Sequence, residues 1–256
     1  MTANEMANEL ELKLDRSASY GSPGYEDFEL SSALSEAQMF YVKKFFDENN
    51  NREGKGFEET EIRDQGFGAL VEDAPSLTPS ASQAGVIVNS NVTGKFFDLP
   101  RDHMYTIYEE CVIDKTVCGT NGEEPIYAYI ITVAHNEMQR FNWSKYKRPF
   151  YKSYGTARIW RSNFSRVVTG IDPSTPATAK RHELFTDGTF GILTYHMRYV
   201  KNPIDIVVDR NTPANQSNCE LQESTHRVII DIATDLMMQR TKDQKMQIIE
   251  GFKDLE

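Results

Sequence analysis

Apolar side chains recur at helical spacing near the amino terminus of the chain. Steps of three and four place five of them on one face of a helix: Leu30, Leu34, Ala37, Tyr41 and Phe45. We expect this helix to begin at about Leu30 and to end near residues 49–51, where three asparagines follow one another. A second helical stretch is predicted over residues 57–71. Residues 25–73 are therefore expected to form a helical hairpin.

The strongest helical pattern lies near the carboxyl terminus. A broad apolar stripe predicts a helix that runs to about Arg240, and residues 245–252 predict a shorter one. We expect these helices, within 219–256, to pack on the amino-terminal helices. The predicted core of this helical bundle consists of Leu34, Tyr41, Phe45, Leu221, Val228, Ile229, Ile232 and Leu236.

The middle of the chain reads as strands. Segments rich in β-branched and aromatic residues lie at 85–88, 104–113, 126–133, 155–168, 190–200 and 204–208. The connector 118–122 predicts a hairpin. Residues 85–210 are thus predicted to form a β-rich module, either a sheet or a sandwich, inserted between the terminal helices. The fold class is α+β.

Two segments have the composition of loops. The first 24 residues end in a string of turn formers, and we expect an extended or mobile arm there. Residues 74–84 are rich in Pro, Ser and Ala, and they predict a loop.

Charge is distributed unevenly along the 256 residues. The chain carries 28 Lys and Arg against 38 Asp and Glu, net −10, so the molecule as a whole should be repelled by nucleic acid and anionic membranes. Residues 1–137 carry −15, residues 138–171 carry +8 and residues 172–256 carry −3. No apolar run is long enough to span a membrane, and the polar start lacks a signal-peptide pattern. We expect synthesis in a cytosol-like compartment.

Sequence signatures of common enzymes are absent. There is no glycine-rich phosphate loop, no dinucleotide fingerprint, no nucleophile elbow and no zinc-protease helix. His182 and Glu183 predict a surface pair in a loop, and no His or Cys spacing fits a metal site, so no metal and no cofactor is expected. For a hydrolase with an unrecognised site, the first residues to inspect would be Asp102, His103 and Glu109.

Three cysteines, Cys111, Cys118 and Cys219, lack the number and spacing of a disulfide framework. In the absence of a secretion signal we expect them to be small buried side chains rather than bridges.

Residues 139–166, here called the aromatic basic segment, combine Lys and Arg with aromatic side chains. One reading is a nucleic-acid surface, because Lys and Arg side chains attract phosphates and aromatic rings stack on nucleobases. The favoured reading is a docking face for protein, since Trp, Tyr and Arg dominate interface hot spots. Ordinary core and surface positions are the third reading. The predicted contact residues are Phe141, Trp143, Lys145, Tyr146, Lys147, Arg148, Phe150, Arg158, Trp160 and Arg161.

Several segments together resemble structural proteins of crAss-like tailed bacteriophages. Residues 30–43 and 56–63 resemble the amino-terminal helices of that group, and residues 97–105 and 195–206 resemble its strands. Residues 219–233 resemble the closing helix of many phage head-to-tail connector proteins. A Pro usually follows the Leu there, whereas this chain has Gln222.

The resemblance implies a non-enzymatic ring or adaptor in the virion neck, assembled in the host bacterial cytoplasm. Helices in an adaptor-like bundle would form the ring, and the β-module would decorate it. The implied partners are other copies in a cyclic homo-oligomer, the portal protein, other neck or tail proteins, and packaged DNA in passing. The alternatives are another tail or minor capsid component, or a nucleic-acid-binding accessory protein that uses the aromatic basic segment.

A ring joined head to tail needs two unlike surfaces on each subunit. The acidic arms and the basic segment of this chain provide such a pair.

Overall fold

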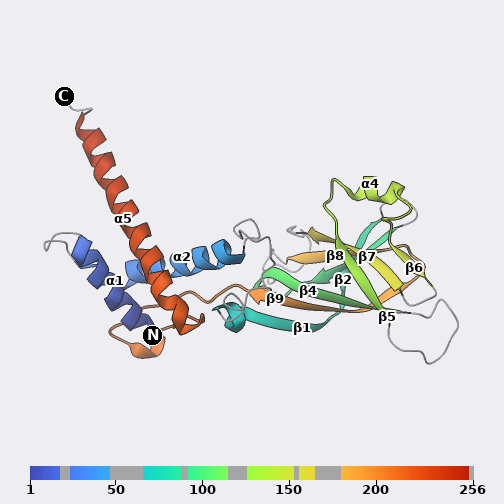
Figure 1. The fold of residues 1–256 in the computed structure, drawn as a ribbon, viewed down its shortest axis with the longest axis horizontal. Helices are drawn as coiled ribbons and strands as arrows, with labels where there is room; N and C mark the ends of the chain where they lie inside the picture. Colours follow the sequence, from blue (N-terminus) through green and yellow to red (C-terminus); the bar gives the residue numbers. More distant parts are fainter. Residues whose placement is uncertain are drawn as a thin grey trace. The chain divides into compact units, whose positions relative to one another are not determined.

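The chain folds into two compact units in a computed structural model, Met1–Leu70 with Asn202–Glu256, and Val71–Lys201. The structure describes residues 1–17, 24–46, 66–87, 92–114, 126–152, 156–164 and 180–253. The first unit is helical and the second is built on a β-sheet (Figure 1). The β-rich module is therefore an insertion between terminal segments, as predicted.

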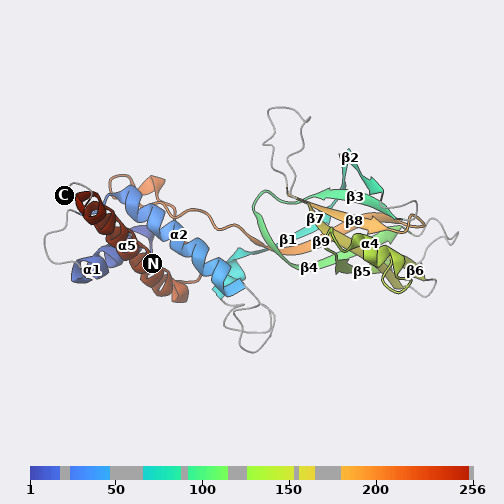
Figure 2. The ribbon, with the colours of Figure 1, turned by 90° about the horizontal axis from the view of Figure 1, so that it is seen from above.

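Three helices form the helical unit: α1 (Ala3–Ser17), α2 (Asp27–Phe46) and α5 (Glu223–Lys253). Both amino-terminal helices contact α5, and Figure 2 shows α1, α2 and α5 close together. Of the predicted core residues, Leu34, Tyr41, Leu221 and Ile229 are buried. Ile232 and Leu236 are half-buried, and the side chain of Phe45 lies outside the described part. The adaptor-like arrangement of this bundle remains a prediction.

Val228 is the exception in the predicted core. Its side chain is 41% exposed, on a face of α5 that it shares with the exposed residues Arg227, Asp231, Asp235 and Gln239. Successive helical residues point about 100° apart, and the buried face of α5 is centred on Ile229 and Ala233, so Val228 points away from that face.

Helix α1 corrects the expectation of an extended arm in residues 1–24. The buried side chains of α1 are spaced by three and four residues: Ala3, Met6, Ala7, Leu10 and Leu14. This apolar face needs a partner, and α5 provides it. The turn formers that suggested an arm lie mostly in residues 18–23, outside the described part.

The other helix boundaries also differ from those predicted. Helix α2 begins at Asp27, one turn before Leu30, and α5 is continuous to Lys253 where two helices were expected. Most of the predicted helix 57–71 lies outside the described residues. The described end of that stretch is a short helical turn that includes η3 (Gly68–Leu70), and strand β1 begins at Val71.

The segment after Asn202 corrects the predicted strand at 204–208. It lies on α2 instead, because the backbone amides of Ile206 and Val208 donate to the hydroxyls of Ser35 (3.0 Å) and Ser31 (2.9 Å). Its one described strand-like contact is the bridge between Val207 and Ser217. Serine side chains on a helix thus replace a neighbouring strand as acceptors.

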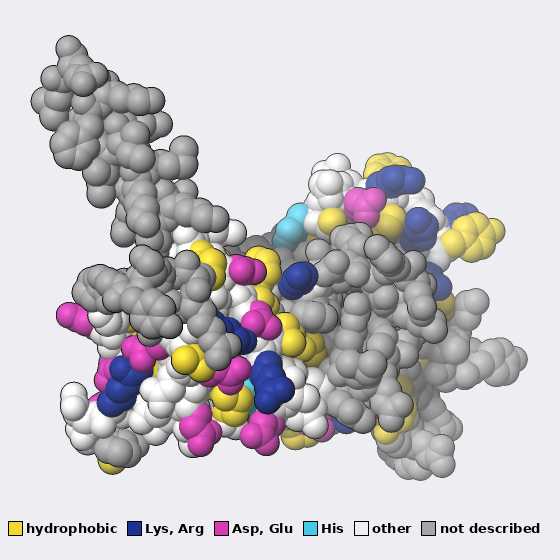
Figure 3. Space-filling view, turned by 60° about the vertical axis from the view of Figure 1, so that its left-hand side comes forward, with side chains coloured by type: hydrophobic (Ala, Val, Ile, Leu, Met, Phe, Trp, Pro, Cys, Tyr) yellow, Lys and Arg dark blue, Asp and Glu magenta, His cyan; other side chains and the backbone are white. Residues whose placement is uncertain are grey.

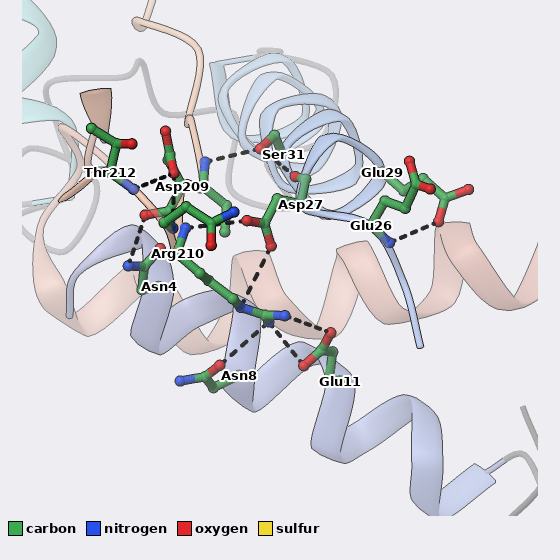
Figure 4. A network of polar contacts seen from close by, with 12 residues as sticks. Asn4, Asn8, Glu11, Glu26, Asp27, Glu29, Ser31, Asp209, Arg210 and Thr212 are labelled. Carbon is green, nitrogen blue, oxygen red and sulfur yellow. Dashed lines mark hydrogen bonds and ion pairs between the residues drawn. The ribbon is translucent and has the colours of Figure 1, made fainter. Parts of the chain in front are cut away.

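Arg210 ties this segment to both amino-terminal helices (Figure 4). Its guanidinium lies 2.9 Å from Glu11 and 3.5 Å from Asp27, and it donates to Asn8 (3.4 Å). Its backbone amide donates to Asp27 (3.1 Å). One side chain therefore holds α1, α2 and the 202–222 segment in register.

The second unit contains a nine-stranded sheet, with strand order β1-β9-β4-β5-β7-β8-β3-β2 and β6 beside β7. The strands are β1 (Val71–Leu77), β2 (Pro79–Ile87), β3 (Thr93–Asp98), β4 (His103–Asp114), β5 (Ile126–Thr132), β6 (Phe150–Lys152), β7 (Thr156–Phe164), β8 (Arg181–Thr186) and β9 (Gly191–Lys201). Only Thr78 separates β1 from β2, which are the two ends of this order. The sheet therefore curls until one bent stretch of chain forms both of its edges.

Strands β1 and β2 correct the predicted loop at 74–84. Strand β1 pairs only with β9 and β2 only with β3 among the described strands. Proline cannot donate to a ladder, so edge strands are where Pro75 and Pro79 fit. The loop-like composition of residues 74–84 is therefore compatible with edge strands.

Predictions for the central strands were mixed. Strands β4, β5 and β9 are confirmed, and β4 and β5 are antiparallel neighbours, although the predicted turn at 118–122 lies outside the described residues. Residues 156–164 form one strand where two were expected, and residues 165–179 are not described. Strand β8 was not predicted at all.

The curled sheet encloses a core on its inner face. The largest buried cluster includes Phe97, Cys111, Ile159, Leu184 and Tyr195, contributed by five different strands. Cys111 is fully buried and unpaired, as expected, and Cys219 is half-buried and unpaired. Cys118 lies outside the described residues. The unit is thus a β-structure with its own hydrophobic core.

Candidate assembly interface

The aromatic basic segment forms the connection between two parallel strands. Strands β5 and β7 are parallel neighbours, so the chain must leave the sheet after β5 and return to start β7 at the same end. On the way it forms α4 (Met138–Trp143) and the short strand β6. Figure 1 shows α4 beside the sheet, at the top of the β-unit. We call residues 133–152 the α4 crossover.

A second apolar cluster anchors the α4 crossover to the outer face of the sheet. Met138 and Val133 are buried against Trp160 of β7 and Phe185 of β8, and Phe141 packs on the cluster from α4. Trp160 is fully buried, and its ring centroid is 6.3 Å from that of Phe141. Trp160 alternates along β7 with Ile159, which belongs to the inner core. The two faces of β7 therefore serve two separate clusters.

Side chains of β7, and Arg148 of the crossover itself, also hold the backbone of the crossover. The indole Nε1 of Trp160 donates to the carbonyl of Lys147 (2.7 Å). Arg158 donates to the carbonyl of Tyr146, and Arg148 donates to the carbonyl of Asn142. These bonds satisfy carbonyls that no helix or strand pairs.

Two cations, one on the crossover and one on β7, lie over aromatic rings of the crossover. The ammonium of Lys147 is 4.4 Å from the centre of the Phe141 ring, and the guanidinium of Arg158 is 4.9 Å from that of Phe150. Cations at this distance are attracted by the ring face. The crossover is therefore held by specific contacts in addition to its apolar anchor.

This anchored crossover presents aromatic side chains to solvent. Trp143 is 81% exposed and Tyr146 is 88% exposed, while Lys145 and Lys147 are exposed beside them. Figure 3 shows Lys and Arg side chains next to hydrophobic ones over α4, at the upper right. Exposed Trp and Tyr side chains that are held in place and surrounded by Lys and Arg are typical of an interface hot spot.

The predicted contact residues divide by burial. Trp160 and Arg161 lie inside the subunit, with Arg161 8% exposed, so the prediction that a partner contacts them is corrected. Phe141, Arg148, Phe150 and Arg158 are half-buried and support the crossover. Strand alternation accounts for this division, because Trp160 and Arg161 point to opposite faces, each of which is covered.

Arg161 belongs to a buried polar cluster on the inner face. It lies 3.3 Å from the carboxylate of Glu109 and donates to the hydroxyl of Thr132 (2.9 Å). The hydroxyl of Tyr195 donates to Glu109 (2.7 Å) and lies 2.8 Å from Nδ1 of His182. Five strands therefore contribute to one hydrogen-bonded polar cluster, in which only Nε of Arg161 lacks a partner among the described groups.

Burial shifts the pKa of these groups. Burial, with the positive charges of Lys180 and Arg161 nearby, lowers the pKa of His103 to about 4, and burial together with Arg161 lowers the pKa of His182 to about 2. Burial raises the pKa of Glu109, although Arg161 and Tyr195 act against that shift. Both histidines are therefore neutral at pH 7.

The cluster corrects the prediction for His182 and Glu183. Both are buried, each 2% exposed, because β8 occupies the middle of the sheet and all six of its residues are buried. Glu183 also explains why the neighbouring strand has a glycine at position 94. A Cβ atom there would lie 2.5 Å from the Glu183 carboxylate. Alternating burial is the usual strand signal, and β8 lacks it because both faces are covered.

The three residues singled out for a hydrolase do not form one site. Glu109 is engaged by Arg161 and Tyr195, and Nε2 of His103 lies 3.0 Å from the hydroxyl of Thr106. Asp102 instead accepts a hydrogen bond from Tyr199 (3.2 Å). Each group has a structural partner, so the arrangement lacks an activated nucleophile with a free base beside it.

These shifts predict a loss of stability in acid. A histidine whose pKa is lowered in the folded state contributes its full stabilisation of the fold above its unfolded pKa of about 6.5. This contribution is lost as pH falls below that value. For His182 we expect a loss of about 3 kcal/mol between pH 6.5 and pH 4. Glu109 acts in the opposite direction, since its raised pKa favours the folded state in acid. Urea unfolding at several pH values measures the sum.

The matched variants for this test are His182→Gln and His135→Gln. His182→Gln should flatten the pH dependence, and His135→Gln is the control at an exposed position outside the buried cluster. An equal slope for the two variants would contradict the assignment.

Fold and surface together define a class of protein: a two-unit α+β subunit with a rigid aromatic surface. Within the described ranges, no three His, Cys, Asp or Glu side chains are grouped so as to hold a metal. No helix in the same ranges combines the length and hydropathy needed to cross a membrane.

The chain belongs to the phage tail ring protein 3/4 family, whose model matches residues 1–247. It is 24% identical to Ring protein 4/5 of Bacteroides phage crAss001 over 246 residues, which cover 92% of each chain. It is also 22% identical to Ring protein 3 of the same phage over 218 residues, covering 82% of this chain and 84% of that one. The resemblance to crAss-like phage structural proteins is thereby confirmed.

Proposed function

We propose that the protein is a non-enzymatic structural subunit of a ring in the virion of a crAss-like phage. Its copies assemble into a cyclic homo-oligomer in the neck, between portal and tail, and DNA passes through the ring. The family match over nearly the whole chain supports the ring, and the names of the two phage relatives point the same way.

The observation that carries the proposal is the exposed aromatic surface of the α4 crossover. Trp143 and Tyr146 are almost fully solvated in the single subunit, although large aromatic side chains gain most when they are buried. Buried anchors at Trp160 and Phe185 hold the segment that presents them. Such pre-organisation lowers the entropic cost of association, which suits a subunit that must assemble.

The charge of the chain suits a conduit for DNA. The protein as a whole carries −10, and a net negative surface does not retain a polyanion at physiological salt. DNA can then move through the ring without being held. This argument also disfavours the alternative of a nucleic-acid-binding accessory protein.

Assembly with the portal protein of the same phage tests the proposal. Electron microscopy and native mass spectrometry of the purified chain, alone and with portal, should show a closed ring seated on the portal. Portal has to be included, since ring subunits of this kind can require a template. A chain that stays monomeric in both mixtures, without affinity for portal or tail proteins, would refute the proposal.

The double substitution Trp143→Ala with Tyr146→Ala tests the surface itself. Both side chains are exposed, so the free energy of unfolding should change by less than about 0.5 kcal/mol. Hot-spot residues contribute about 2 kcal/mol or more each, so we expect the protein concentration for half-maximal assembly to rise more than tenfold. The control is Lys95→Ala, exposed on β3. Unchanged assembly of the double variant would exclude these two residues from the interface.

A further inference from the structure

A row of exposed tyrosines lies on the outer face of the sheet, next to the part covered by α4. Tyr108 of β4 is 53% exposed, and Tyr127 and Tyr129 of β5 are 54% and 70% exposed. Ala128, between the two β5 tyrosines, is buried in the inner core, which places both tyrosines on the outer face. The sequence analysis assigned these residues to strands and did not single them out.

Strand register joins this row to the α4 crossover. Tyr129 is the direct neighbour of Arg158 on the parallel strand β7. The Arg158 guanidinium lies over the ring of Phe150 and donates to the carbonyl of Tyr146. The row and the crossover therefore form one surface, which we call the tyrosine face: Tyr108, Tyr127, Tyr129, Trp143, Tyr146 and Arg158.

Tyr108 lies at the other end of the tyrosine face. Its hydroxyl donates to Glu110 (2.7 Å). That hydrogen bond raises the pKa of the Tyr108 phenol, although the charge of Arg198 acts against the shift. Of the nearby acids, Asp73 is neutralised by Arg198 (2.7 Å), whereas Glu110 accepts a hydrogen bond from a neutral phenol and keeps its charge. Lys145, Lys147 and Arg158 outnumber Glu110, so the balance of charge at this surface is positive.

The chemistry of the tyrosine face is that of a protein-binding surface. Tyr and Trp give large contact areas at a low cost in conformational entropy, and their polar atoms tolerate a wet rim. Lys145 and Lys147 border the face on the crossover side. A partner that fits this surface offers apolar contact area and a negative charge.

The two units of this chain differ strongly in charge. Residues 1–70 with 202–256 contain 25 Asp and Glu against 13 Lys and Arg, net −12, whereas residues 71–201 contain 13 against 15, net +2. The helical unit also exposes large apolar side chains, among them Phe28 (80%) and Phe40 (49%). An acidic surface with exposed aromatic side chains is the complement that the tyrosine face requires.

We propose that the tyrosine face of one copy docks on the acidic helical unit of the next copy in the ring. This inference rests on the proposed ring and specifies its subunit contact. The two surfaces are unlike, so the contact is heterologous and propagates from copy to copy until a ring closes. Self-pairing of two tyrosine faces would place positive charges opposite each other.

A charge series at Tyr129 tests the sign of the partner. Tyr129→Glu and Tyr129→Lys remove the same aromatic side chain and introduce opposite charges. If only the loss of the aromatic contact matters, the two variants should have equal effects. Docking on an acidic unit predicts that Tyr129→Glu raises the concentration for half-maximal ring assembly more than tenfold above that of Tyr129→Lys. Asn163→Glu is the control, since it makes the same charge change at an exposed residue of β7 on the opposite face. Equal effects of Glu and Lys at position 129 would overturn the proposal.

Photo-crosslinking identifies the docked segment. A benzophenone amino acid at position 129, activated in the assembled ring, should yield peptides joined to residues 1–46 or 202–240 of another copy. A ring that crosslinks position 129 to residues 71–201, or to portal or another neck protein, would overturn this inference and leave the proposed ring intact. Failure of the wild-type chain to form a ring would refute the proposed function, and the inference with it.

Discussion

Trp160→Ala is expected to lower the free energy of unfolding of the β-unit by about 4 kcal/mol and to release the α4 crossover. Trp160 is fully buried, and replacing a large core aromatic residue by alanine leaves a cavity that costs about 3–5 kcal/mol. The same change removes the indole that donates to the carbonyl of Lys147, so this acceptor loses its partner in the protein. Destabilisation and loss of the presented surface should therefore occur together.

Trp143→Ala is the matched control, because these are the two tryptophans of the chain and one is buried while the other is 81% exposed. It should leave stability nearly unchanged and reduce assembly. Urea unfolding followed by tryptophan fluorescence measures both variants, since each retains one indole. Similar unfolding midpoints for the two variants would contradict the anchoring role of Trp160.

Breaking the buried ion pair should have an effect of similar size. Glu109→Leu removes the carboxylate 3.3 Å from Arg161 and leaves the guanidinium buried without its counter-charge. The loss of one partner from a buried pair costs about 3–5 kcal/mol. The hydroxyl of Tyr195 loses its acceptor in the same variant. We expect the β-unit of Glu109→Leu to unfold at a clearly lower urea concentration.

The double variant Glu109→Leu with Arg161→Met separates charge from packing. Apolar side chains of similar volume can replace a buried ion pair at little cost, so the double variant should recover most of the stability lost by Glu109→Leu. Glu110→Leu is the neighbouring control. Its hydrogen bond to Tyr108 is exposed, and the expected loss is below about 1 kcal/mol. A double variant less stable than Glu109→Leu would contradict this explanation, because Arg161 would then stabilise the fold even without its counter-charge.

Errors in the sequence analysis of the β-unit share a physical cause. Pro75 and Pro79 made residues 74–84 resemble a loop, but they lie on edge strands. His182 and Glu183 resembled a surface pair because ionisable residues are seldom buried. The partners that allow their burial include Tyr195, a residue 13 positions further along the chain. Local composition contains no information about such partners.

The aromatic basic segment was found from sequence, but the roles of its members were not. Its charge and aromatic content are properties of the chain and need no structure. Trp143 and Trp160 look equivalent in that pattern, yet one is exposed and the other is the anchor. Their difference follows from the place of Trp160 on β7, under the crossover.

The sequence by itself determined the α+β class, the packing of helices from both ends of the chain, the central β-rich insertion and the family. These features depend on periodicity and on short patterns that survive in the linear order of residues. The tertiary structure alone decided which side chains are presented, because burial depends on what covers each face of a strand. It joined Tyr108, Tyr127 and Tyr129 to the α4 crossover through strand register. Those contacts link residues that are distant along the chain, and no local pattern records them.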